Sequence, residues 1–149
     1  MKLATYTEHK EQVALMQWWR LQCKRYGVAE HLLFAIPNGG ARNVVTGAIL
    51  KAEGVRPGVP DLFLAVSRGP FYGMFIEMKR VHNGRLFESQ RLFSIDLTRQ
   101  GYENHVCYGW IQAKECIEEY MQHPPSQWSM LSQAHDEQNK TRTLTTSDL

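Results

Sequence analysis

Apolar and polar positions follow a helical period near the start of the chain. Apolar residues at helical spacing predict a helix over 7–26, capped by Thr7 and ended by Gly27. Positions 8, 12, 15 and 19 fall on one stripe of this helix. We therefore expect Glu8 to stand at the end of a line of residues that leads into the core.

Short apolar runs between turn signals predict strands at 31–36, 62–66, 71–78 and 106–108. The second and third runs are joined by Ser67-Arg68-Gly69-Pro70, which predicts a hairpin with a tight connection. Both runs are almost continuously apolar. This character indicates strands covered on both faces, as in a sheet flanked by helices.

Further helices are expected at about 41–52 and 88–100, and a last one carries Ala113, Ile117, Tyr120 and Met121 on a single stripe. Helices that alternate with strands predict an α/β fold, with a sheet flanked by helices. This domain is expected to span residues 1–123. The segment 124–149 is polar and without periodicity, which predicts a loosely ordered tail able to dock through Trp128.

Composition narrows the class of protein. A length of 149 residues with 43% apolar residues suits one compact domain, and a formal net charge of +2 permits a nucleic-acid partner without requiring one. The chain has no run of about 18 apolar residues and no apolar signal-peptide core at its start, so we expect a cytoplasmic protein that does not enter membranes. The odd count and spacing of the three cysteines argue against a disulfide framework and a zinc site, and indicate buried apolar residues.

Three charges stand in the two apolar runs of the predicted hairpin. Asp61 opens the first strand, while Glu77 and Lys79 project to the same face of the second strand. A lone Glu-x-Lys is ordinarily a surface salt bridge worth about 0 to 1 kcal/mol. Two adjacent carboxylates, however, repel each other unless one is protonated or a cation lies between them. The pattern therefore predicts a Mg²⁺ or Mn²⁺ site, with Lys79 beside it, suited to phosphodiester hydrolysis.

The motif Pro60-Asp61 followed by Glu77-Met78-Lys79 resembles the active-site pattern of the PD-(D/E)XK nuclease superfamily. More narrowly, the chain from about 7 to 121 resembles the virus-type replication-repair nuclease (VRR-NUC) domain. The segments that carry this likeness are IPNGGARNVVTGAILKAEGVRPGVPDLFL, GMFIEMKR, GRLFESQ and GYENHVCYGW. The resemblance implies a restriction-endonuclease-like core, which is a central mixed β-sheet flanked by helices.

The resemblance also implies roles for individual residues. Asp61, Glu77 and the backbone carbonyl of Met78 would bind the metal ion, and Lys79 would orient or deprotonate the attacking water. Gln90 would support the site from the start of its helix. A glutamate of the first helix would complete the catalytic and metal-binding set, and we expect Glu8, with Glu11 as the alternative.

One position departs from the family pattern. Members of the family often carry Ser or Thr where Phe87 stands. The usual cap of the helix that carries Gln90 is therefore missing, which leaves the start of that helix open.

DNA contacts are expected around this site. The candidates are Asn38, Gly39, Arg42, Lys51 and Arg80. Backbone N–H groups of the turn could contact phosphates, and the basic side chains could supply salt-sensitive attraction, although both features also occur in plain turns and solvated faces.

The sequence therefore predicts a metal-dependent DNA endonuclease that acts on branched or flapped DNA as a homodimer and leaves a 5′-phosphate and a 3′-hydroxyl. The alternatives are a non-catalytic DNA-binding or assembly module on the same fold, and a nuclease directed at RNA.

Overall fold

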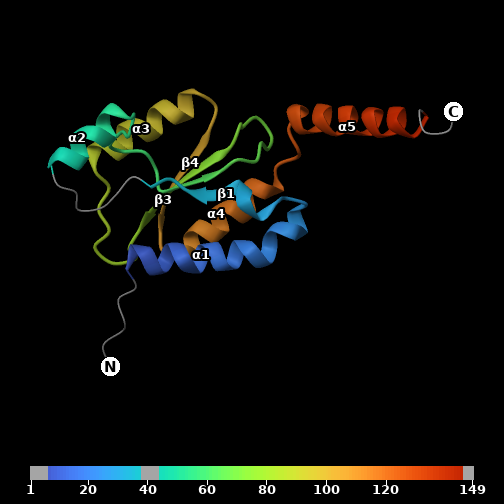
Figure 1. Ribbon diagram of the computed structural model, residues 1–149. Helices are drawn as coiled ribbons and strands as arrows, with labels where there is room; N and C mark the ends of the chain where they lie inside the picture. Colours follow the sequence, from blue (N-terminus) through green and yellow to red (C-terminus); the bar gives the residue numbers. More distant parts are fainter. Residues whose placement is uncertain (1–6, 38–43, 146–149) are drawn as a thin grey trace.

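The computed structural model describes residues 7–37 and 44–145. These residues form one four-stranded sheet in the order β1-β2-β3-β4 (Figure 1). The strands are β1 (Leu33–Ala35), β2 (Leu62–Leu64), β3 (Met74–Lys79) and β4 (Glu103–Tyr108). Strands β1, β2 and β3 pair antiparallel, and β4 runs parallel to β3. The predicted mixed sheet of an α/β fold is confirmed.

The first helix, α1 (Glu8–Gln22), continues into a 3-10 turn, Cys23–Tyr26, and ends at Gly27 with φ 65°. Thr7 caps it through a hydrogen bond from the Lys10 N–H, as predicted. The expected inward line was wrong in one respect, because Glu8 is exposed and the acid in the buried stripe is Glu11. Glu11 lies one turn before Leu15, so it continues the buried stripe. Glu8 lies almost two turns before Leu15, at the first residue of the helix, where the core no longer covers it.

Helices α1 and α4 (Trp110–Gln122) cover one face of the sheet (Figure 1). All four residues of the predicted α4 stripe are buried there. They pack with Leu15 and Trp19 of α1 and with the alternate residues of β2 and β3 that face them. Burial of this apolar surface, at about 25 cal/mol per Å², is the main force that holds the domain together.

The opposite face carries a row of aromatic rings. Phe34, Phe63 and Phe75 are cross-strand neighbours, and the rings of Phe63 and Phe75 stack with centroids 4.3 Å apart. On this side lie α2 (Val44–Ala52) and α3 (Glu88–Arg99) (Figure 1). Aromatic residues on one face and aliphatic residues on the other explain why β2 and β3 read as continuously apolar.

The strands differ from their predicted bounds. Strands β2 and β3 are shorter than expected, so the connection between them spans 65–73, closed by paired backbone hydrogen bonds between Arg68 and Phe71. A 3-10 turn at Glu30–Leu32 precedes a short β1. Strand β4 is longer than expected, because an edge strand also accommodates the polar residues Glu103, Asn104 and His105.

The segment after 123 differs most from expectation. The structure has a helix there, α5 (Gln127–Thr145), and Trp128 is 55% exposed rather than docked. The segment before α5 is tied to the β2–β3 connection by a 2.6 Å bond between the hydroxyls of Ser67 and Ser126. Whether 1–123 and 124–149 are separate units stays a prediction. Among the described helices none has the length and apolar character to cross a bilayer.

Candidate active site

The hairpin register brings the two predicted carboxylates together. Leu62 of β2 pairs with Ile76 of β3, so the next step along both strands sets Asp61 opposite Glu77. Asp61 Oδ2 accepts a 2.7 Å hydrogen bond from the Met78 backbone N–H, which fixes the carboxylate at the start of β2. Asp61, Glu77 and Lys79 share one face of the sheet, as the strand alternation predicts.

Glu77 is the most tightly held residue of the site. Its Oε1 accepts hydrogen bonds from the Lys79 ammonium at 2.7 Å and from the Gln90 side-chain amide. Its Oε2 is buried and has no hydrogen-bond partner. The Glu77 and Lys79 side chains are only 6% and 5% exposed. The alternative of a surface salt bridge is therefore wrong, and one buried carboxylate oxygen is left without a ligand.

The electrostatics of the two acids reflect their burial. Removal from water raises the pKa of Glu77 to about 7, and repulsion from Asp61 and Glu8 adds to the rise although Lys79 opposes it. Burial also raises the pKa of Asp61, and Glu8 adds to the rise. The Met78 N–H, Lys79 and a side-chain hydrogen bond from Glu77 in its protonated form lower it. Both acids therefore lack sufficient compensating positive charge, which is the condition that a bound cation relieves.

Helix α3 positions Gln90 against Glu77. Its first residue is Glu88, and Phe87 stands at the cap position without a capping side chain. Gln90 makes the reciprocal contact of a capping box, since its Oε1 accepts a 2.9 Å hydrogen bond from the Phe87 N–H while its amide donates to Glu77. The helix start that the sequence left open is thus fixed by the same side chain that supports the site.

Sequence reasoning missed the role of Gly58. This residue has φ +88°, and a Cβ placed there would lie 2.4 Å from the carbonyl oxygen of Ser89. The loop before Asp61 therefore packs directly on the first turn of α3. The available signal was Gly58 itself, between two prolines in an extended lead-in.

The two first-helix glutamates have different surroundings. Glu8 is exposed, and its charge acts on both Asp61 and Glu77. Glu11 is buried, and its Oε2 accepts a 2.8 Å hydrogen bond from the Trp110 N–H at the start of α4. Glu11 therefore caps α4, where a negative charge is favourable, whereas Glu8 is the glutamate whose field reaches the site.

Lys79 is held at the end of β3 by its neighbours. Its carbonyl accepts a 2.9 Å hydrogen bond from the Gly109 N–H. A Cβ at Gly84 would lie 2.9 Å from the Cβ of Lys79, so the turn after β3 folds back tightly on this strand. The Lys79 ammonium also lies 5.9 Å from the centre of the Phe87 ring. These contacts hold Lys79 at the end of β3, with its ammonium group beside the carboxylates.

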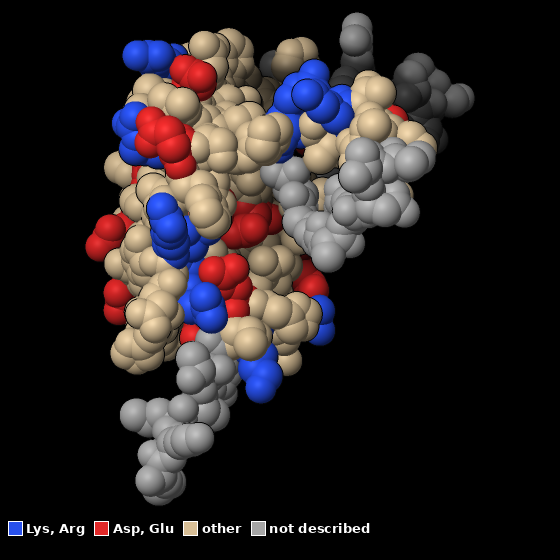
Figure 2. All heavy atoms as spheres, turned by 90° about the vertical axis from the view of Figure 1, so that its left-hand side faces the viewer, with Lys and Arg blue, Asp and Glu red and all other residues tan. Residues whose placement is uncertain are grey.

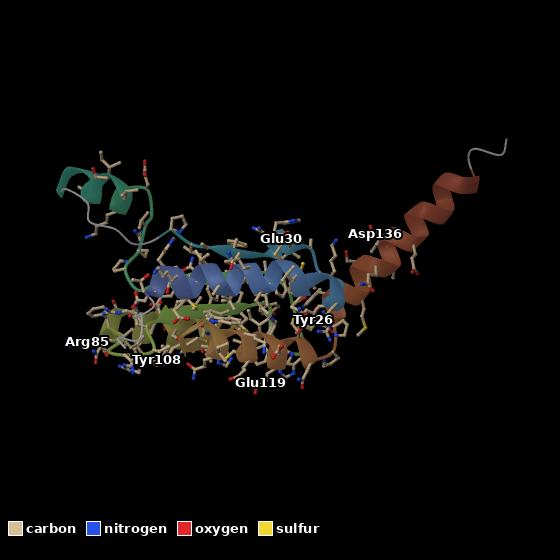
Figure 3. The ribbon with its side chains drawn as sticks, turned by 90° about the horizontal axis from the view of Figure 1, so that it is seen from below. Tyr26, Glu30, Arg85, Tyr108, Glu119 and Asp136 are labelled. Carbon is tan, nitrogen blue, oxygen red and sulfur yellow. The ribbon has the colours of Figure 1, made fainter. Side chains whose placement is uncertain are left out.

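The predicted DNA-binding residues are only partly described. Lys51 and Arg80 are exposed, while Asn38, Gly39 and Arg42 lie outside the described residues. Figure 2 faces the side of the molecule where α1 begins, and it shows acidic side chains at the middle of that face with Lys and Arg side chains around them. Arg85 and Tyr108 lie at the same end of the molecule (Figure 3).

The carboxylates alone do not form a complete metal cage. Within 7–37 and 44–145, no group of three or more His, Cys, Asp or Glu side chains is gathered closely enough to hold a metal ion. Asp61 and Glu77 therefore offer two side-chain ligands, one of them the unpartnered Glu77 oxygen. A hard divalent cation in such a site takes its remaining oxygens from backbone, water or phosphate.

The comparisons with known proteins give a family and a fold. The family model of the VRR-NUC domain matches residues 4–110. A solved structure described as a VRR_NUC domain protein superposes with a TM-score of 0.71, is 24% identical, and covers 83% of this chain and 94% of its own. That likeness supports the fold. No curated protein matches the chain.

Proposed function

Because the chain belongs to the VRR-NUC family, we propose that it is a divalent-metal-dependent endonuclease that hydrolyses phosphodiester bonds in branched DNA. The family gives the nuclease-type fold. The observation that carries the proposal further is the Glu77 carboxylate, which is buried beside Asp61 and has one oxygen without a partner. A protein that only bound DNA would have no physical need to hold two acids together against their repulsion.

The residues present fit a Mg²⁺ or Mn²⁺ ion. Asp61 and the Oε2 of Glu77 would hold it, with the carbonyl of Met78 as the third protein ligand. A divalent ion bound there lowers the pKa of water and neutralises charge that develops on the phosphate. Because Glu8 is exposed and acts through its charge, we propose that it tunes the site or binds through water.

The chain's own residues supply the rest of the chemistry. The Lys79 ammonium, anchored by Glu77 at 2.7 Å, is placed to donate to the attacking water or to a phosphate oxygen. Gln90 keeps Glu77 in one orientation by its hydrogen bond to Oε1. Both contacts occupy Oε1, so Oε2 would be the oxygen available to a cation. The products would carry a 5′-phosphate and a 3′-hydroxyl.

Exposed basic side chains around the acids would hold the DNA. Lys51 and Arg80 are exposed, and their contacts with phosphates would make binding sensitive to salt. One site in a chain of 149 residues cuts one strand at a time, so we propose a homodimer for cleavage of both strands of a branched substrate.

The test is cleavage of matched DNA and RNA junctions in Mn²⁺ by the wild-type protein and by Lys79→Met. We expect the wild type to cut the DNA junction, and Lys79→Met to cut about 100-fold more slowly or not at all while binding it equally well. Lys24→Met, a change of an exposed lysine on the 3-10 turn after α1, is the matched control and should cut at the wild-type rate.

Two results would reject the proposal. Binding without cleavage by the wild type would favour the non-catalytic module, and cleavage of the RNA junction alone would favour a ribonuclease. Equal cleavage by wild type and Lys79→Met would remove the lysine from the mechanism.

A further inference from the structure

A second group of reactive side chains lies on the other face of the sheet, between β4 and α4. Residues alternate along β4, so Glu103, His105 and Cys107 lie on the face that α4 covers, while Tyr108 lies on the face of Lys79. Glu103, His105 and Cys107 take no part in the proposed hydrolysis. The group is completed by Cys116 of α4.

The two sulfur atoms are close enough to react. The thiol of Cys107 donates a hydrogen bond to the Sγ of Cys116 at 3.8 Å. Cys107 is fully buried, whereas Cys116 is only half-buried and is the more accessible residue of the pair. A disulfide bond requires about 2.05 Å between the sulfurs, so the two side chains must move closer together before the bond can form.

The surroundings of Cys116 favour its thiolate form. The hydrogen bond from Cys107 and the neighbouring His105 together lower the pKa of Cys116 to about 5, against the opposing effects of burial and of Glu119. His105 is held in turn by Glu103, with 2.6 Å between Nε2 and Oε1. A thiolate beside an imidazolium is the form of cysteine that attacks electrophiles.

We propose that Cys116 and Cys107 are a redox-active thiol pair, which a hydroperoxide oxidises to an intramolecular disulfide. The Cys116 thiolate attacks the outer oxygen of the hydroperoxide, the O–O bond breaks, and the sulfur becomes a sulfenic acid as water or an alcohol leaves. Cys107 then attacks that sulfur, the S–O bond breaks, and water leaves with the Cys107 proton. Two thiols thereby lose two electrons and two protons to one peroxide.

The position of the pair gives the disulfide a structural consequence. The segment between the two cysteines contains Gly109 and Trp110, whose N–H groups bind the Lys79 carbonyl and the Glu11 carboxylate. The disulfide would close this turn from β4 to α4 covalently. The pair itself lies on the opposite face of the sheet from the two acids of the candidate site, so its chemistry does not depend on nuclease activity.

The test uses the intact wild-type protein, hydrogen peroxide and trypsin. Trypsin separates the three cysteines into peptides 21–24, 100–114 and 115–140, because Lys114 lies between Cys107 and Cys116. After oxidation and blocking of free thiols, we expect peptides 100–114 and 115–140 to be joined, and peptide 21–24 with Cys23 to be fully blocked. Cys107→Ser should instead accumulate a sulfenic acid on Cys116 that dimedone traps.

A variant of the histidine tests the activation of the thiol. His105→Gln should shift the pH profile of thiol alkylation at Cys116 upward and slow its oxidation at pH 6 by about tenfold. Free alkylation of all three cysteines after peroxide treatment, or a bond that involves Cys23, would overturn the thiol pair. An unchanged alkylation profile in His105→Gln would overturn the role of His105.

Discussion

At the scale of single residues, the two carboxylate oxygens of Glu77 have different surroundings and different proposed roles. Oε1 accepts from Lys79 and Gln90, and Oε2 is buried without a partner. A carboxylate fixed on one side and open on the other is suited to bind a cation, because it is already desolvated and oriented. In the metal-free protein the same arrangement destabilises the charged form of Glu77.

The protonation of Glu77 predicts a pH dependence of stability. Its pKa rises from 4.5 to about 7 on folding, so between these values the folded chain binds more protons than the unfolded chain. The contribution of Glu77 is fully present below pH 4.5 and is lost as pH rises through about 7. In the presence of a chelator, the free energy of unfolding should fall by about 1 to 3 kcal/mol across this window.

Glu77→Gln is the matched variant for denaturant unfolding at a series of pH values. It keeps the shape of the side chain and loses the titration, so its stability should stay nearly level where that of the wild type falls. Parallel pH profiles of the two proteins would contradict the buried, uncompensated acid.

The two glutamates of α1 predict opposite outcomes. Glu11→Ala should destabilise the fold by about 1 to 2 kcal/mol, because the Trp110 N–H at the start of α4 loses its partner. Glu8→Ala should leave the free energy of unfolding within about 0.5 kcal/mol and slow cleavage of branched DNA. Thermal unfolding and cleavage rates measured on both variants decide the assignment, which fails if Glu11→Ala alone slows cleavage at full stability.

At the scale of elements, the site depends on how α3 meets the loop before β2. Gln90, in the first turn of α3, donates a hydrogen bond to Glu77. The same turn lies against Gly58, so closely that a Cβ at position 58 would have no room. Helix α3 therefore contacts both the loop before β2 and the β2–β3 hairpin, and a shift of one of these elements would move the others. A change in the loop should reach the carboxylates through Gln90.

Gly58→Ala tests this coupling, with Gly54→Ala as its control. Both glycines have positive φ, +88° and +99°, but a Cβ at Gly54 meets no atom within 4 Å. Backbone strain should cost about 1 kcal/mol in either variant. Only Gly58→Ala should also slow cleavage, by about tenfold or more, since it displaces α3. Equal cleavage by the two variants would show that the contact does not position Gln90.

At the scale of the whole molecule, the sequence predicted what period and spacing determine. Strand alternation is a local property, so the common face of Asp61, Glu77 and Lys79 was predictable from the two hairpin runs. The stripe of α4 was predictable for the same reason. The α/β class followed from the order of the elements.

Features that depend on distant partners were not predictable. Glu11 caps α4 through the Trp110 N–H, which is 99 residues away in the sequence, and helical spacing gives no sign of that contact. The described side chains of helix α5 are mostly exposed. The helix therefore does not need a buried apolar stripe, and the helical period that would have predicted it is missing from the sequence. The start of β4 was not predicted because its first three residues, Glu103, Asn104 and His105, are polar.

The most direct measurement of the central claim is a calorimetric titration of Mn²⁺ into the metal-free protein. The account predicts saturable binding at one site per chain in the wild type and in Lys79→Met, and loss of that binding in Asp61→Asn and Glu77→Gln. Wild-type protein without saturable Mn²⁺ binding, or binding that both carboxylate variants retain, would contradict the account.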